Sequence, residues 1–181
     1  MIFPIFFNFL QNLPMENFSS EFLLNQGWFG KYPDPNELKI IEENNFTDII
    51  DLTTPSDNLP SYQFNGYYWH YPIDDHRTPP DLKKFETFID QILEILSHDP
   101  KRKIYVHCKG GHGRSGVFVA STLKRIYKIN HPEATNDEAT QYALNLTYNL
   151  HQQRKIMKSQ WRRVGAPQTQ AQRDFVKNIF Q

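Results

Sequence analysis

Apolar residues along this chain recur with two spacings, one typical of helices and the other of buried strands. Between Leu82 and Leu96 they lie three and four residues apart, which predicts an amphipathic helix that ends near Pro100. The same spacing predicts helices over 117–129, 135–150 and 168–180, and a short helix after Asp34. Runs rich in β-branched and aromatic residues predict strands over 46–52, 67–71 and 103–107.

Local signals indicate where several elements begin or end. Asp34 and Thr135 each open a capping-box pattern. Thr78-Pro79 has the form of a cap followed by a first-turn proline, and it predicts the start of the helix that carries Leu82. The glycines of Gly27-Trp28-Phe29-Gly30 predict a turn that closes a first short strand near 22–24.

The alternation of strands and helices predicts an α/β fold with a central, mainly parallel sheet flanked by helices. A length of 181 residues suits one domain with a full core. We expect residues 1–26 to form an N-terminal aromatic arm with the first strand, and residues 27–181 to form the functional domain.

Composition narrows the functional classes. Twenty basic and twenty acidic residues balance, so no overall basic field favours nucleic acid. A single cysteine excludes an internal disulfide and fits a reducing compartment, the cytoplasm or the nucleus. The seven histidines form no metal-ligand motif, so we predict no metal and no other cofactor.

The first ten residues, Met1–Leu10, are strongly apolar. They lack a basic region and a cleavage site, and they are too short to span a bilayer. We favour an aromatic arm docked on the domain or an edge strand. Contact with a membrane surface or with a second copy of the chain is the alternative.

The segment 104–116 carries the candidate chemistry. An apolar run leads to Cys108, a glycine-rich loop follows, and Arg114 lies six positions after the cysteine. Such a loop can turn its N–H groups toward one anion at a helix N-terminus, where Arg114 can hold two phosphate oxygens. The positive potential of these N–H groups and of Arg114 also favours the reactive thiolate form of Cys108. This predicts attack by sulfur on phosphorus. The predicted phosphate-binding positions are Lys109, Gly110, Gly111, His112, Gly113 and Arg114.

His107-Cys108, five residues and then Arg114-Ser115 resemble the signature of the cysteine-dependent protein phosphatases. The length of the chain resembles their dual-specificity branch. Ser115 can donate its hydroxyl to the sulfur and so help it leave. The resemblance further implies that His107 supports the loop and tunes the thiol.

The resemblance also implies a general acid on a loop, an aspartate three residues after one proline and four before another. Asp75 fits this spacing and Asp74 does not, although both could be ordinary solvated acids. Gln168 and Gln172 resemble the paired glutamines with which larger members position the hydrolytic water. The alternative is an ordinary polar helix start.

The class of substrate remains open at this point. Phosphotyrosine and phosphoserine or phosphothreonine in proteins are favoured, because we find no extra loop for a deep phosphotyrosine pocket. Lys109 and His112 occupy positions where phosphoinositide phosphatases have lysines, and we expect His112 to titrate near neutrality. The basic stretch Arg154–Arg163 would suit an RNA 5′-phosphatase, although it is more typical of a solvated helix face. A non-catalytic phosphate-binding protein is disfavoured, because cysteine, arginine and acid are all present.

Overall fold

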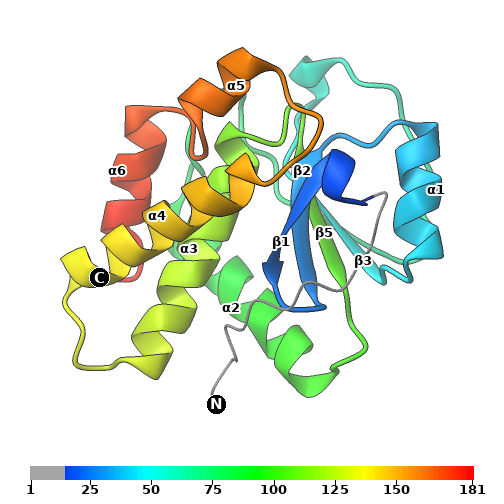
Figure 1. Ribbon diagram of the computed structural model, residues 1–181. Helices are drawn as coiled ribbons and strands as arrows, with labels where there is room; N and C mark the ends of the chain where they lie inside the picture. The colour runs from blue at the N-terminus through cyan, green and yellow to red at the C-terminus, as the bar shows by residue number, and fades with distance from the viewer. Residues whose placement is uncertain (1–14) are drawn as a thin grey trace.

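A five-stranded sheet forms the centre of the computed structural model, which describes residues 15–181 (Figure 1). β1 is antiparallel to β2, and every other pair of neighbours is parallel. The predicted α/β class with a mainly parallel sheet is therefore confirmed. In spatial order the strands are β1 (Ser19–Leu23), β2 (Gly27–Lys31), β5 (Ile104–Cys108), β3 (Asp48–Asp51) and β4 (Tyr67–His70).

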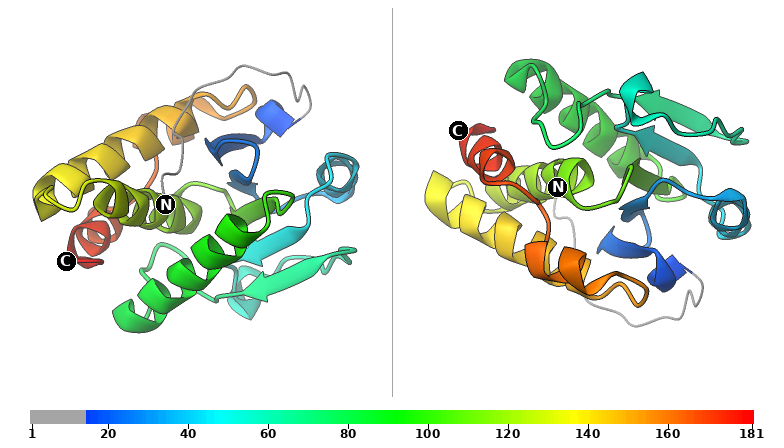
Figure 2. Two further views of the ribbon diagram at one scale, coloured as in Figure 1. Left: turned by 90° about the horizontal axis from the view of Figure 1, so that it is seen from below. Right: turned by 90° about the horizontal axis from the view of Figure 1, so that it is seen from above.

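Helices cover both faces of this sheet. Figure 2 shows α1 on one side of the strands and α2, α3, α4 and α6 on the other. The helices are α1 (Pro35–Glu43), α2 (Leu82–His98), α3 (Gly113–Asn130), α4 (Asn136–Gln152), α5 (Ser159–Val164) and α6 (Gln170–Asn178), and two short 3₁₀ turns are η1 (Met15–Asn17) and η2 (Pro55–Asp57).

The central strand β5 contributes side chains to both layers. Val106 and Cys108 belong to the larger core with α2, α3 and α4, and Tyr105 belongs to the smaller core with η1 and α1. This alternation is the two-residue period of a strand. Cys108 is the last residue of β5, so it lies at the carboxyl end of the sheet, where α/β proteins bind ligands.

The capping predictions at Asp34 and Thr135 are confirmed, since both form capping boxes. The predicted start at Thr78-Pro79 is wrong. α2 begins at Leu82, and the Asp81 carboxylate accepts a hydrogen bond from the Lys84 N–H. The reason is that Pro79 precedes Pro80, and a residue before proline is disfavoured in the helical region.

The predicted turn over Gly27–Gly30 is also wrong, because these residues form strand β2. Glycine is required at 30 for close packing rather than for a turn. A Cβ there would collide with Tyr105 Oη on the neighbouring strand, and Gly111 packs against the backbone of Gly30. The turn lies at 24–26, where Asn25 has a φ of 58°.

The predictions for the aromatic arm Met1–Leu10 fall outside the described residues. Within residues 15–181, no helix combines the length and the hydrophobicity that a membrane crossing requires.

Candidate active site

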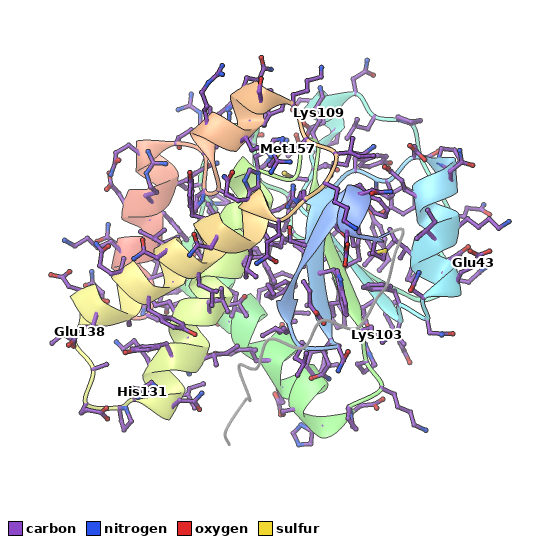
Figure 3. All side chains as sticks on the ribbon, in the orientation of Figure 1. Glu43, Lys103, Lys109, His131, Glu138 and Met157 are labelled. Carbon is purple, nitrogen blue, oxygen red and sulfur yellow. The ribbon has the colours of Figure 1, made fainter. Side chains whose placement is uncertain are left out.

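The glycine-rich segment forms a tight cradle between β5 and α3. The Gly111 N–H donates to Cys108 Sγ at 3.2 Å, and the cysteine side chain is almost fully buried. Gly111 has a φ of +74°, a conformation that favours glycine. Because α3 begins at Gly113, its first free N–H groups face the same loop. In Figure 3 Lys109 lies at the end of the molecule where Figure 1 shows α5.

Arg114 is buried in the first turn of α3, and two carboxylates hold its guanidinium group. Nη1 donates to Asp57 Oδ2 at 2.6 Å and to the Ile73 carbonyl at 3.0 Å. Nη2 donates to Asp57 Oδ1 at 2.8 Å and to Asp75 Oδ1 at 2.9 Å. The remaining donor, Nε, is buried and has no hydrogen-bond partner among the described residues. A buried, charged donor without a partner is costly, so the site is prepared for an anion.

Asp57 is the residue of this site that sequence reasoning missed. It is buried in η2, where its carboxylate also accepts from the Thr54 N–H at 2.9 Å. The hydrogen bonds from Arg114 hold the pKa of Asp57 below its ordinary value. The only available signal was a cap-like Thr54-Pro55 pair followed by an acid, within a loop rich in proline and serine.

This ion pair predicts a pH-dependent contribution to stability. A carboxyl whose pKa is lower in the folded state stabilises the fold above its unfolded pKa of about 4 and loses that effect as pH falls. We expect Asp57→Asn to lower the free energy of unfolding by about 2 kcal/mol at neutral pH and by much less in acid. Urea unfolding at about pH 7 and about pH 3 would measure this. Exposed Asp74→Asn is the control, and an equal loss at both pH values would contradict the assignment.

The loop that carries the predicted acid lies over the cradle. Asp75 contacts Arg114 and is half exposed, whereas the Asp74 carbonyl accepts the Arg77 N–H at 3.0 Å. His76, directly after Asp75, has a φ of 60°, and its N–H donates to the Asp75 carboxylate at 3.1 Å. Of the two candidate acids, Asp75 is therefore the one that the structure brings to the arginine.

Ser115 and His107 lie next to the cysteine. The Ser115 hydroxyl is buried and donates to the Gly30 carbonyl at 3.5 Å, so the predicted hydrogen bond to the sulfur is not formed in this structure. His107 Nε2 lies 2.7 Å from Tyr62 Oη. Burial lowers the pKa of His107, so this residue ties the end of β5 to the loop before β4 as a neutral ring.

Both glutamines of the predicted pair gather at Gly113. A Cβ built on Gly113 would lie 2.9 Å from Gln172 Nε2 and 3.3 Å from Gln168 Oε1. Gln172 is fully buried, accepts from the Gln168 N–H at 3.1 Å and donates to the Arg77 carbonyl at 3.0 Å. It therefore links α6, the cradle and the loop of Asp75.

The expectation that His112 titrates near neutrality is wrong. Burial, with a smaller effect of Arg154, lowers the pKa of His112 to about 4, so the ring is neutral at physiological pH. Its ring stacks on Trp161 of α5 with centroids 5.1 Å apart. Lys109 is the exposed cation of the loop, and its Nζ donates to the Asp57 carbonyl at 3.2 Å.

The interpretation of Arg154–Arg163 as a solvated face is wrong for Arg154, a second residue that sequence reasoning missed. It is buried, and its Nη1 donates to the Gly111 carbonyl at 2.7 Å and its Nη2 to the Phe29 carbonyl at 3.1 Å. Burial lowers the pKa of Arg154 to about 10. The guanidinium thus fixes the back of the cradle. Its sequence neighbourhood of lysine and glutamine gave no signal of burial.

Chemically, this arrangement brings together a thiol, a buried arginine and a loop carboxylate, which are groups that could attack, bind and protonate a phosphate ester. Within the described residues, no three His, Cys, Asp or Glu side chains gather into a cluster suited to a metal ion. A cysteine that ends a central parallel strand, with an arginine in the first turn of the next helix, is the arrangement that the resemblance to the cysteine-dependent phosphatases predicts.

Comparisons with known proteins extend this assignment. Residues 29–128 match the family model described as "Polymorphic toxin system, DSP-PTPase phosphatase". The chain is 30% identical over 168 residues to a candidate tyrosine phosphatase, 067L, of Invertebrate iridescent virus 3, and 34% identical over 116 residues to another, 197R, of Invertebrate iridescent virus 6. These alignments cover 91% and 62% of this chain, but only 66% and 43% of the two viral proteins.

A solved structure of Tk-PTP in its active form shares the fold, with a TM-score of 0.63 and 21% identity over 89% of this chain and 95% of that chain. The chain therefore belongs to the cysteine-dependent protein-tyrosine phosphatase superfamily, in its dual-specificity branch. The predicted resemblance is confirmed.

Proposed function

We propose that this chain hydrolyses phosphomonoesters through a phosphocysteine intermediate, and that its substrates are phosphotyrosine and phosphoserine or phosphothreonine in proteins. One observation carries the proposal: within residues 15–181, buried Arg114 has no hydrogen-bond partner for Nε, while Asp57, Asp75 and the Ile73 carbonyl hold its two Nη groups. A phosphate dianion would satisfy that donor together with the amides of the cradle.

In the first step, Cys108 Sγ attacks phosphorus and the bond from phosphorus to the leaving oxygen breaks. Asp75 gives its proton to that oxygen, so the leaving group departs as a neutral alcohol or phenol. Arg114 and the cradle amides stabilise the charge on the phosphoryl oxygens.

In the second step, a water molecule held by Gln168 attacks the phosphocysteine. Asp75, now a carboxylate, takes a proton from the water, and the sulfur leaves as the thiolate while inorganic phosphate forms.

Two features reduce the positive charge that the site offers to lipid and RNA phosphates, and so favour protein substrates. His112 is neutral, so it offers no charge to a second phosphate group. Of the basic stretch, Arg154 is buried and Arg162 donates to the carbonyls of Gln152 and Arg154.

The single cysteine is consistent with a reducing compartment, the cytoplasm or the nucleus.

The proposal is tested by hydrolysis of p-nitrophenyl phosphate and by a panel of a phosphotyrosine peptide, a phosphothreonine peptide, a phosphoinositide and a 5′-triphosphorylated RNA. We expect turnover that vanadate inhibits, a preference for the peptides and, after an acid quench, a phosphorylated Cys108 in the mass spectrum. Hydrolysis without a phosphoenzyme would refute the mechanism, and a preference for lipid or RNA would refute the substrate class.

The role of Gln168 gives a separate prediction. Because Gln168 lies at Gly113 rather than in contact with Arg114, we expect Gln168→Ala to slow dephosphorylation of the enzyme about tenfold or more and to leave its phosphorylation nearly unchanged. Rapid-quench kinetics with p-nitrophenyl phosphate should then show a burst followed by a slow steady state. Gln170→Ala, an exposed neighbour on α6, is the control. A variant without a burst would contradict this role.

A further inference from the structure

A chain of polar contacts leads from the cradle into the helical layer. His112 Nδ1 lies 2.8 Å from His151 Nε2, and the two rings are nearly perpendicular, with an interplanar angle of 81°. His151 is fully buried near the end of α4. Since both rings are neutral, only one of the two facing nitrogens carries the shared proton.

Gln152 determines which nitrogen that is. Its Nε2 donates to the Arg162 carbonyl at 2.9 Å, and a carbonyl can only accept, so this end of the side chain is the NH₂ group. The same NH₂ lies 3.5 Å from His151 Nδ1, at the long end of the hydrogen-bond range, and this orientation favours the tautomer in which Nδ1 is unprotonated. The proton of His151 is then on Nε2 and is donated to His112 Nδ1.

It follows that His112 carries its own proton on Nε2. That edge of the ring lies over the phosphate loop, because a Cβ built on Gly110 would be 2.9 Å from His112 Cδ2 and 3.3 Å from Nε2. Trp161 stacks on the face of the His112 ring, at an interplanar angle of 22°, and helps to hold its orientation.

We propose that His151 locks His112 in the tautomer with its proton on Nε2, so that position 112 offers the substrate an uncharged hydrogen-bond donor at the rim of the cradle. This proposal rests on the proposed function, since it assigns a further contact to the same phosphate site. His151 is a positioning residue here, and Gln152 fixes its tautomer.

The His112 Nε2–H group stays protonated and the ring stays uncharged through the physiological pH range. Burial lowers the pKa of His112 to about 4 and that of His151 to about 2. The charged groups that act on the pair are Arg154, which lowers both values, and Arg162, which lowers that of His151. Among residues 15–181, no carboxylate contributes to either shift.

The first test is NMR of the full chain labelled with ¹⁵N-histidine, without substrate. Both imidazoles should appear as Nε2–H tautomers, unchanged from about pH 5.5 to about pH 8. A proton on His112 Nδ1, or titration of either ring near its ordinary pKa, would overturn the proposal.

The second test measures the affinity for inorganic phosphate in His151→Phe, which keeps an aromatic ring and removes the hydrogen bond. In this variant the His112 resonances should show mixed tautomers. An equal mixture leaves the donor on half of the molecules, which predicts about twofold weaker phosphate binding. His131→Phe, a half-exposed histidine beyond α3, is the control.

Gln152→Leu is the second variant should His151→Phe fail to fold, with exposed Gln153→Leu as its control. It should also give mixed tautomers of His112 and weaker phosphate binding. Unchanged phosphate affinity in a folded variant with mixed tautomers would overturn the donor role. Because neither measurement requires turnover, a chain that meets both expectations but hydrolyses no phosphomonoester would refute only the proposed function.

Discussion

Replacing Cys108 with serine should abolish hydrolysis of p-nitrophenyl phosphate, with a loss of about ten-thousandfold or more. A serine hydroxyl at this position has no base within the cradle to deprotonate it, whereas sulfur ionises far more readily. Binding should survive, because Arg114 and the amides of the cradle do not depend on the sulfur.

The two measurements are therefore steady-state hydrolysis and the affinity of Cys108→Ser for a phosphotyrosine peptide, by calorimetry. We expect the peptide to bind the variant about as tightly as it binds the wild type. Substantial remaining hydrolysis would point to another nucleophile. Loss of both activity and binding in a folded variant would indicate a structural role for this buried side chain.

Replacing Asp75 with asparagine should lower kcat by about a hundredfold or more without weakening substrate binding, because the leaving oxygen then receives no proton. The loss should depend on the leaving group. A phosphoserine peptide, which releases a strongly basic alkoxide, should suffer most, and p-nitrophenyl phosphate, which releases a stable phenolate, should suffer least.

Asp74→Asn is the matched control, since it makes the same change one residue away on a side chain that does not contact Arg114. It should keep nearly wild-type kcat on all substrates. If the two variants lose activity equally, or if the loss at Asp75 is the same for every leaving group, the assignment of the acid is incorrect.

Local patterns were sufficient for much of the fold and for the centre of the site. The helix over 82–96, the capping boxes at Asp34 and Thr135, and the strand before Cys108 all depend on neighbours within one or two turns. The cradle was predictable for the same reason, because Cys108 and Arg114 lie within one loop and one helix start.

The residues that were missed act over long distances in the sequence. Asp57 reaches Arg114 across 57 positions, and Arg154 reaches the Gly111 carbonyl across 43. The pKa of His112 depends on burial by partners from α4 and α5, which no local pattern contains. Gly30 led to a wrong prediction of a turn, because close packing between strands requires glycine just as a turn does.

Residues on the N-terminal side of the segment that matches the family model contribute to the site. Glu16 and Asn17 accept hydrogen bonds from the Lys155 and Ile156 N–H groups at 2.9 and 3.0 Å, and Ser20 Oγ accepts one from Arg154. The family model begins only at residue 29. A recombinant fragment trimmed to that boundary would lose the outer strand β1 and these anchors of Arg154, so a recombinant form of this domain should start upstream of Met15.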